Sequence, residues 1–427
     1  MNDFNSPEYK RSRAAYVMQC TAEHFVTLLV TDAFLAKLLS YIGISDALVG
    51  IISSFVSLAF VIQLAAIFLV KLKLSTKRLV ITFDTMSIFF FMFLYLIPFL
   101  PLPQSTKTVL VVLSVLIAYF GKYLIYSLCF KWGNSYVEPT NRASFSATKE
   151  IISLITGMAF TAIVGYVIDT YEGLGNIEGG FLFLAIAIFI LNVCNFTCLM
   201  LIKKEDASEH KADNEPFSKV IKEILGNKNF KSIIVLTILY DVARYFTIGF
   251  VGVYKTKDLV MSVFLVQLVN MVANMTRALI SKPMGRYSDR KSFAKGFRFG
   301  LCLMAAAFFV LMFTTKSTWW LIIVYTILYN CSYAGTNANS FNIAYSYVDS
   351  KYISQAMAIK NSIGGVLGFG VSILAGRVLE LVQANNNTVL GFHVYGQQIL
   401  AGISFVIVVI SIVFINKVIV KQEVKIQ

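Results

Sequence analysis

Residues 180–202 read GFLFLAIAIFILNVCNFTCLMLI and contain no charged side chain. A helix needs about 20 mostly apolar residues to cross the hydrocarbon core of a bilayer. This stretch therefore predicts a membrane-spanning helix. Other stretches of the chain meet the same criterion, and each predicts a further span: 14–40, 45–70, 79–101, 107–132, 144–169, 231–255, 258–281, 295–314, 318–346, 355–380 and 396–418.

The composition places the whole chain in the same class. Of the 427 residues, 57% are hydrophobic and 14% are charged, whereas a soluble domain carries about 25% charged residues. Indole rings favour the headgroup zone of a bilayer, and the tryptophans fall at the ends of predicted spans: Trp132, Trp319 and Trp320. We therefore predict an all-α, polytopic membrane protein with twelve transmembrane helices.

The basic surplus follows the predicted loops. The chain has 37 Lys and Arg residues and a net charge of +14. Most of these basic residues lie in the amino-terminal tail, in the loops after even-numbered spans and in the carboxy-terminal tail. The positive-inside rule then predicts that both termini are cytoplasmic. Because topology explains the surplus, nucleic-acid binding is not expected; we expect a monomer in a bilayer, the bacterial inner (cell) membrane.

One polar segment divides the chain. Residues 203–229, KKEDASEHKADNEPFSKVIKEILGNKN, carry both charge signs and no apolar run of span length. They predict a cytoplasmic linker with a short amphipathic helix at 217–226, between a first bundle (1–202) and a second bundle (230–427). The bundles also match each other: SYVEPTNRASFSATKEIISLITG (135–157) aligns without a gap on SYVDSKYISQAMAIKNSIGGVLG (346–368). This repeat predicts two pseudo-symmetric six-helix bundles, as in transporters built from parallel repeats.

The loop predicted after the eighth span has the most specific motif. Residues 282–296, KPMGRYSDRKSFAKG, resemble the glycine–x–x–x–aspartate–arginine loop of the major facilitator superfamily, with Gly285, Asp289 and Arg290 in place. Ser292 departs from the family pattern, which has a second glycine there. With the length, linker and repeat, the resemblance covers essentially the whole chain. It implies a secondary transporter that works by alternating access, and not an enzyme.

The same loop predicts a cytoplasmic gate. Gly285 permits a tight turn, and an aspartate is stabilised at the amino terminus of a helix; the resemblance places Asp289 against the fifth helix. Arg286 and Arg290 can then pair with acidic residues that end the fourth and tenth helices. The alternative is that all of these are solvated charges that only set the topology. The predicted gate comprises Gly285, Arg286, Asp289, Arg290, Glu138, Arg142 and Asp349.

Ionisable groups inside the predicted spans indicate where a substrate could bind. Each costs about 2.5–3.5 kcal/mol at mid-bilayer unless it faces protein or water. Polar residues share helix faces on the first, fourth, seventh, eighth and tenth spans, and the resemblance implies that the first, fourth, seventh and tenth line a central cavity. The alternative is interhelical polar contacts. The predicted cavity residues are Glu23, Thr27, Lys122, Tyr126, Asp241, Arg244, Tyr245, Asn270, Asn274, Asn330, Tyr333 and Asn337.

A carboxylate facing a lysine suggests coupling to protons. Protonation of Glu23 would release Lys122, and Asp241 with Arg244 forms a second candidate pair; sodium coupling and facilitated diffusion stay open. The substrate is predicted to be a small polar solute, with sugar-like compounds slightly favoured over organic ions because amide and aromatic groups dominate the faces. The alternatives are a multidrug or organic-ion efflux carrier of the same fold and a non-transporting solute receptor. Neither a cofactor nor a metal is expected, because no ligand cluster or phosphate loop occurs.

Overall fold

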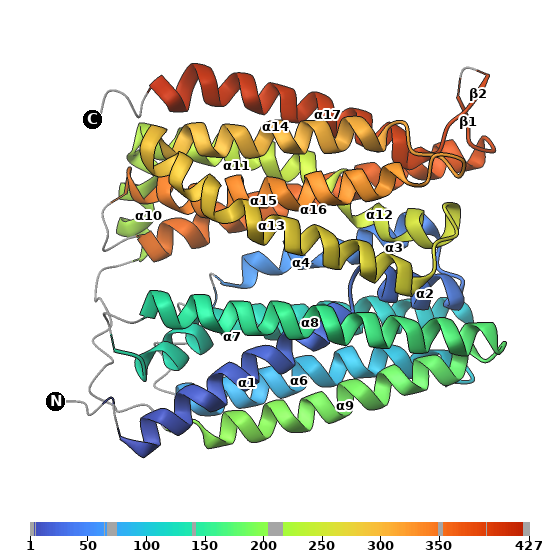
Figure 1. Cartoon of the computed structure of the whole chain (residues 1–427), viewed down its shortest axis with the longest axis horizontal. Helices are drawn as coiled ribbons and strands as arrows, with labels where there is room; N and C mark the ends of the chain where they lie inside the picture. Colours follow the sequence, from blue (N-terminus) through green and yellow to red (C-terminus); the bar gives the residue numbers. More distant parts are fainter. Residues whose placement is uncertain are drawn as a thin grey trace. The chain divides into compact units, whose positions relative to one another are not determined.

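The computed structural model describes residues 4, 6–63, 65, 75–138, 142–203, 217–348, 353–389 and 391–421. Helices dominate this part of the chain (Figure 1). The chain divides into two compact units. The first unit comprises Met1–Ile44, Ile62–Asp213 and Ser262–Gln267, and the second comprises Ser45–Val61, Asn214–Met261 and Leu268–Gln427.

The first unit is a bundle of long helices. In it, α6 packs against α7 and α9, and α1 packs against α8 and α9 (Figure 1). Its core joins aromatic residues of α1 and α7, including Tyr16 and Trp132. Its elements are α1 (Pro7–Leu29), α2 (Asp32–Ile42), α6 (Thr76–Leu96), η2 (Ile97–Phe99), α7 (Gln104–Ser135), α8 (Arg142–Gly173) and α9 (Ile177–Leu201).

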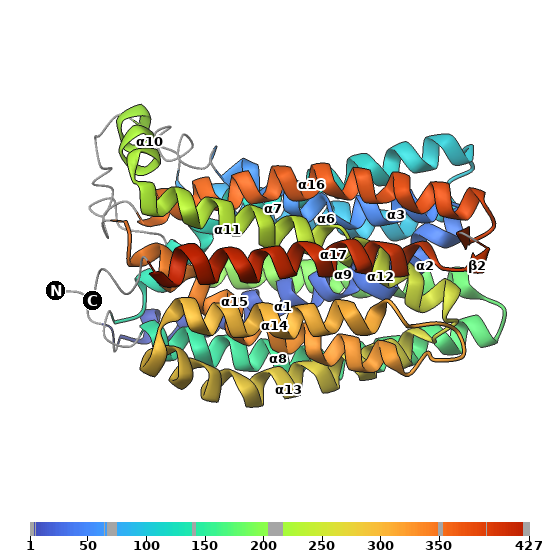
Figure 2. The same cartoon turned by 90° about the horizontal axis from the view of Figure 1, so that it is seen from above.

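The second unit is also helical. Here α14 packs against α15 and α17, and α11 packs against α16 and α17; Figure 2 shows α14 and α17 side by side. Its helices are α3 (Asp46–Ser53), α4 (Phe55–Ala59), η1 (Phe60–Ile62, whose last residue belongs to the first unit), α10 (Phe217–Gly226), α11 (Lys228–Tyr245), α12 (Ile248–Val253), η5 (Tyr254–Asp258), α13 (Val263–Lys291, whose first residues belong to the first unit), α14 (Phe293–Leu311), α15 (Leu321–Tyr345), α16 (Ile353–Ala384), α17 (Gly396–Phe414) and η7 (Ile415–Ile419). The short strands β1 (Thr388–Val389) and β2 (Phe392–His393) pair antiparallel, with Thr388 opposite His393.

The two compact units differ in two places from the two bundles predicted on either side of the linker 203–229. The second predicted span begins with α3 and α4, which pack against α16 within the second unit. Conversely, the first residues of α13 belong to the first unit, where the Asp169 carboxylate of α8 accepts the backbone N–H groups of Val263 and Phe264 at 2.9 and 2.8 Å. A carboxylate in this position satisfies N–H groups that have no partner within the helix. The bundle boundaries at 202 and 230 stay a prediction.

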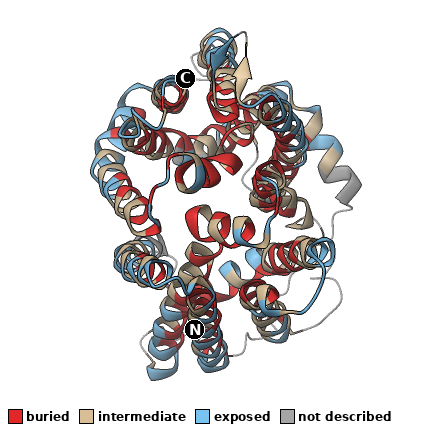
Figure 3. Ribbon diagram, turned by 90° about the vertical axis from the view of Figure 1, so that its right-hand side faces the viewer, coloured by how far each residue is buried: buried red, intermediate tan, exposed pale blue. Residues whose placement is uncertain are grey.

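The apolar helices have the length that a membrane requires. In the part of the chain that the structure describes, eight helices are long and apolar enough to cross a bilayer, or nine if α1 and α2 form one bent span. The prediction of helices is confirmed, including α10 in the linker; the count of twelve spans stays a prediction. Within each unit, buried residues lie where helices pack against one another, and exposed residues lie on the remaining faces (Figure 3).

Two predicted spans are interrupted. The span predicted at 14–40 bends by 44° between α1 and α2, where Asp32 has a φ of 49°. A positive φ is uncommon for a residue with a side chain. Within the single apolar span Lys228–Asp258, which matches the prediction at 231–255, α11 ends at Tyr245 and α12 begins at Ile248. The sequence has no proline at either break.

Candidate functional site

An ion pair joins α1 and α7 in the first unit. The Lys122 Nζ atom lies 2.9 Å from Glu23 Oε1, and the side chains are 15% and 21% exposed. Lys122 Nζ also donates to Thr27 Oγ1 at 2.7 Å, and Gln19 Nε2 donates to Glu23 Oε2 at 3.1 Å. Residues four apart on a helix share a face, which is why Glu23 and Thr27 both reach Lys122 while Gln19 reaches Glu23. The predicted partners therefore meet.

This network extends to a second carboxylate that the sequence analysis left out of the site. Asp84 on α6 is 2% exposed and accepts a hydrogen bond from Asn195 Nδ2 of α9 at 2.6 Å. Asp84 also lies near enough to Glu23 and Lys122 to interact with their charges. The available signal was an aspartate inside a predicted span, together with an asparagine in the uncharged stretch 180–202. Asp84 is thus a second carboxylate beside the Glu23–Lys122 pair.

A second cation faces this network from α8. Lys149 Nζ lies 3.4 Å from the Tyr16 hydroxyl and 4.7 Å from the centroid of the Tyr16 ring. With Lys122 it balances the two carboxylates, Glu23 and Asp84. The ionisable side chains of this cluster therefore have no net charge when all are ionised.

In the second unit, Arg244 lies within a group of tyrosines. Its guanidinium carbon is 5.0, 5.3 and 5.4 Å from the ring centroids of Tyr240, Tyr245 and Tyr333, distances at which a cation is attracted to an aromatic face. Arg244 Nη1 lies 3.3 Å from Asp241 Oδ1, so the second predicted pair also forms. Arg277 of α13 lies 5.3 Å from the Tyr333 centroid, and thus two guanidinium groups contact one ring.

Two glycines of α16 let this helix pack closely against Arg244 and its neighbours. A Cβ atom at Gly364 would collide with the Asp241 carboxylate, and one at Gly368 would collide with the Tyr245 ring. Lys360, one turn before Gly364, is 4% exposed and donates to Ser340 Oγ of α15 at 2.8 Å. Close packing of α16 against α11 thus brings a third cation toward Asp241.

The other predicted cavity residues are less closely connected. Asn330 Nδ2 donates to the Thr326 carbonyl of its own helix at 2.9 Å. Asn337 and Tyr126 are exposed, and the Tyr126 ring lies 6.0 Å from that of Tyr123. The remaining two lie half-buried one turn apart on α13: Asn270 and Asn274.

The predicted turn at Gly285 is wrong. α13 runs unbroken from Val263 to Lys291 with Pro283 inside it, so Gly285 lies within a helix. The turn comes instead at Ser292, whose Oγ accepts the Lys295 backbone N–H at 3.2 Å and caps α14. The serine at 292 fits this later end, because a serine side chain readily caps the start of the next helix.

The predicted gate residues have separate outcomes. Four of them are exposed: Arg286, Asp289, Arg290 and Glu138. Asp349 lies outside the described residues, and so does the side chain of Arg142. The gate therefore stays a prediction.

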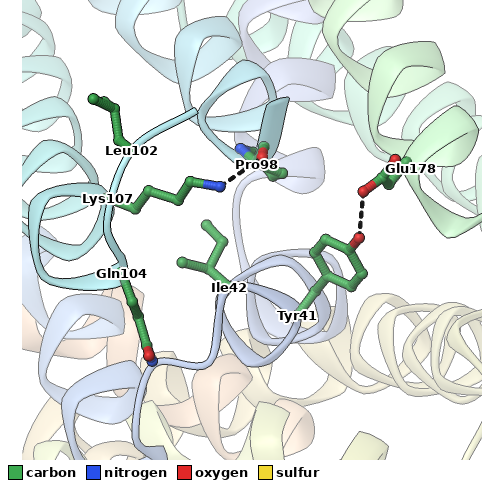
Figure 4. Close-up of a pocket in the computed structure, with 7 residues that line it drawn as sticks. All are labelled: Tyr41, Ile42, Pro98, Leu102, Gln104, Lys107 and Glu178. Carbon is green, nitrogen blue, oxygen red and sulfur yellow. Dashed lines mark hydrogen bonds between the residues drawn. The ribbon is translucent and has the colours of Figure 1, made fainter. Parts of the chain in front are cut away.

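A pocket of about 490 Å³ opens at one end of the first unit. Figure 4 shows its lining: Tyr41, Ile42, Pro98, Leu102, Gln104, Lys107 and Glu178. The Tyr41 hydroxyl donates to Glu178 Oε1 at 2.5 Å, and Lys107 Nζ donates to the Pro98 carbonyl at 2.7 Å. This pocket includes none of the predicted cavity residues. In the described residues, no group of His, Cys, Asp and Glu could hold a metal ion.

Comparison with known proteins places this geometry in a family. The model of the Major Facilitator Superfamily matches residues 22–373. Sequence comparison with curated proteins gives no match. Several solved structures have the same fold. The nucleoside transporter NupG has a TM-score of 0.69 at 15% identity, over 96% of this chain and 99% of that chain. A D-xylose–proton symporter has a TM-score of 0.73 at 12% identity, over 95% and 96%. The POT family transporter PepTSo has a TM-score of 0.69 at 11% identity, over 95% and 98%.

Proposed function

Because the chain belongs to the major facilitator superfamily, we propose that it moves a small polar solute across the membrane by alternating access, coupled to protons. The family and the fold point to a transporter rather than an enzyme. The Glu23–Lys122 ion pair is the observation that carries the proposal, since it combines a proton acceptor and a cation within two predicted membrane spans. Carriers of nucleosides, of D-xylose and of peptides with the same fold give further support.

The coupling step follows from the charges. A carboxylate and an ammonium inside a span stabilise each other, and each is costly alone. When Glu23 takes a proton, it loses its charge, and Lys122 keeps the hydrogen bond to the neutral Thr27 hydroxyl. Lys122 can then turn toward a bound solute or toward Asp84. Proton binding and solute binding thereby favour the same change of conformation.

Transport by purified protein in proteoliposomes tests this proposal. A thermal-shift screen against a solute library at two pH values first identifies a transported solute. Glu23→Gln should then abolish accumulation driven by a proton gradient and leave solute exchange measurable, because exchange needs no net proton movement. Normal uphill uptake by this variant would contradict the coupling role of Glu23.

Two other functions give different results in the same vesicles. A solute receptor with a transporter fold would bind a solute without accumulating it. A multidrug or organic-ion efflux carrier would accept apolar cations, which the arginines near Tyr333 would repel. We further infer that both termini are cytoplasmic, that the protein is a monomer and that it lies in a bacterial inner membrane. Labelling in intact cells, of cysteines introduced at the two termini of the protein, tests on which side of the membrane the termini lie.

A further inference from the structure

We propose that the second unit binds an anionic group of the substrate, a carboxylate or a phosphate, through Arg244 and Arg277 beside Tyr333. This inference rests on the proposed transport function and defines the substrate class. These three residues lie at a similar depth along their helices. Arg277 is the middle residue of α13, Tyr333 is the middle residue of α15, and Arg244 lies next to the centre of the span Lys228–Asp258. Transporters of this kind bind their substrates near the bilayer midplane.

The charges around this group do not balance. Arg244, Arg277 and Lys360 are cations, whereas Asp241 is the single carboxylate at mid-span in the described part of the second unit. The ionic cluster of the first unit is balanced, so the surplus is specific to the second unit. An uncompensated charge at mid-bilayer is costly. A bound anion would supply the missing negative charge.

The contacts of the two arginines leave room for such a ligand. Arg244 is held by long contacts: 3.3 Å to Asp241 and 3.4 Å to the Tyr329 hydroxyl. Hydrogen bonds from N–H donors are usually 2.7–3.2 Å long. Arg277 has the Tyr333 ring as its side-chain contact and no carboxylate partner within the described residues. Both guanidinium groups therefore retain donors for an oxyanion.

The chemistry of these side chains favours an oxyanion over a sugar hydroxyl. The planar guanidinium group presents a fork of donors that matches a carboxylate or a phosphate. Tyr333, held edge-on to Tyr329 with a ring separation of 5.3 Å, orients both guanidinium groups by contact with its ring. Asn330, one of the amides that favoured sugars in the sequence, donates to its own helix. Transport of an anion together with a proton would also reduce the net charge that crosses the membrane.

The experiment compares solutes that differ by one anionic group. Thermal unfolding of the purified full-length protein is followed at constant ionic strength with galactose and galacturonate, and with ribose and ribose 5-phosphate. We expect at least one anion to stabilise the wild type more than its neutral partner does. The two pairs separate a carboxylate from a phosphate.

The variants then assign the preference to Arg277. Arg277→Gln should weaken binding of the anion on the order of ten- to a hundredfold, because it removes a charged hydrogen bond. Arg277→Lys should keep the preference for the anion with lower affinity. Arg298→Gln is the matched control, since this half-buried arginine of α14 contacts Asn416 at 2.8 Å instead of the tyrosines. Equal stabilisation by the neutral and anionic partners, or an unchanged preference in Arg277→Gln, overturns the inference.

Proteoliposomes separate this inference from the proposed function. Proton-driven accumulation of a neutral solute, with the same rate in Arg277→Gln, would overturn anion binding and leave proton-coupled transport intact. Anion binding that depends on Arg277, without any accumulation, would support the site and contradict the transport function. Accumulation of the anion that is lost in Arg277→Gln supports both.

Discussion

Replacement of Lys122 by methionine leaves a carboxylate without its cation. The substitution removes an ammonium that lies 2.9 Å from Glu23 Oε1 and 2.7 Å from Thr27 Oγ1. Removal of one partner of a fully buried ion pair costs about 3–5 kcal/mol, because the other charge stays uncompensated. Glu23 is 21% exposed and keeps the hydrogen bond from Gln19. We therefore expect Lys122→Met to lower the free energy of unfolding by about 2–3 kcal/mol.

A double-mutant cycle isolates the pair itself. Glu23→Gln alone leaves the charge of Lys122 uncompensated, so it should also destabilise the protein. The double variant E23Q/K122M has neither charge, and the amide of the new glutamine can still pair with Gln19. Its loss of stability should therefore be smaller than the sum of the two single losses, by about 2 kcal/mol.

Thermal unfolding in detergent, followed by intrinsic fluorescence, measures these differences. We expect the Tm of Lys122→Met to fall on the order of 5 °C. Lys107→Met is the matched control, because this lysine of the same helix donates to the Pro98 carbonyl at 2.7 Å instead of to a carboxylate, so its loss leaves no carboxylate uncompensated. A Tm of Lys122→Met equal to that of the wild type, or losses that simply add in the double variant, would refute the reasoning.

Two further changes test the gate and the packing of α16. Asp289→Asn should lower the turnover of transport in proteoliposomes more than the affinity for solute, because a gate residue acts on the conformational change; unaltered turnover would argue against the gate. Gly364→Ala should lower the free energy of unfolding by about 1–3 kcal/mol, because its Cβ atom meets Asp241. Gly370→Ala, where nothing lies within 4 Å of the added atom, should leave the Tm unchanged or raise it; an equal fall in both alanine variants would contradict the packing argument.

Several features of the site were predictable because they depend on helix periodicity alone. Glu23 and Thr27 lie one turn apart on a predicted helix, and both contact Lys122 in the structure. The pairing of Asp241 with Arg244 is equally local, since the two residues are three positions apart on one helix. In both cases the spacing along one helix decided which side chains could share a face.

Other features depended on neighbours that are distant in the sequence. Trp132 lies at the end of a predicted span, and the sequence therefore predicted an indole among the lipid headgroups. In the structure the Trp132 side chain is fully buried within the protein. Its indole N–H lies 3.0 Å from the Tyr136 hydroxyl and 3.1 Å from the Lys203 carbonyl. Asp84 reaches Asn195 only because α6 packs against α9. No periodicity along one helix contains this information.

The sequence by itself determined the helical membrane class, because an apolar run of span length requires a helix in a bilayer, and the motif at 282–296 with the internal repeat indicated the family. It also predicted which charges lie inside the spans. Only the tertiary structure decided which of those charges meet: the pair on α1 and α7, its extension to Asp84, and the two guanidinium groups at Tyr333. The physical reason is that the hydrophobic pattern specifies which faces are buried, whereas partners depend on the order and tilt with which the helices pack.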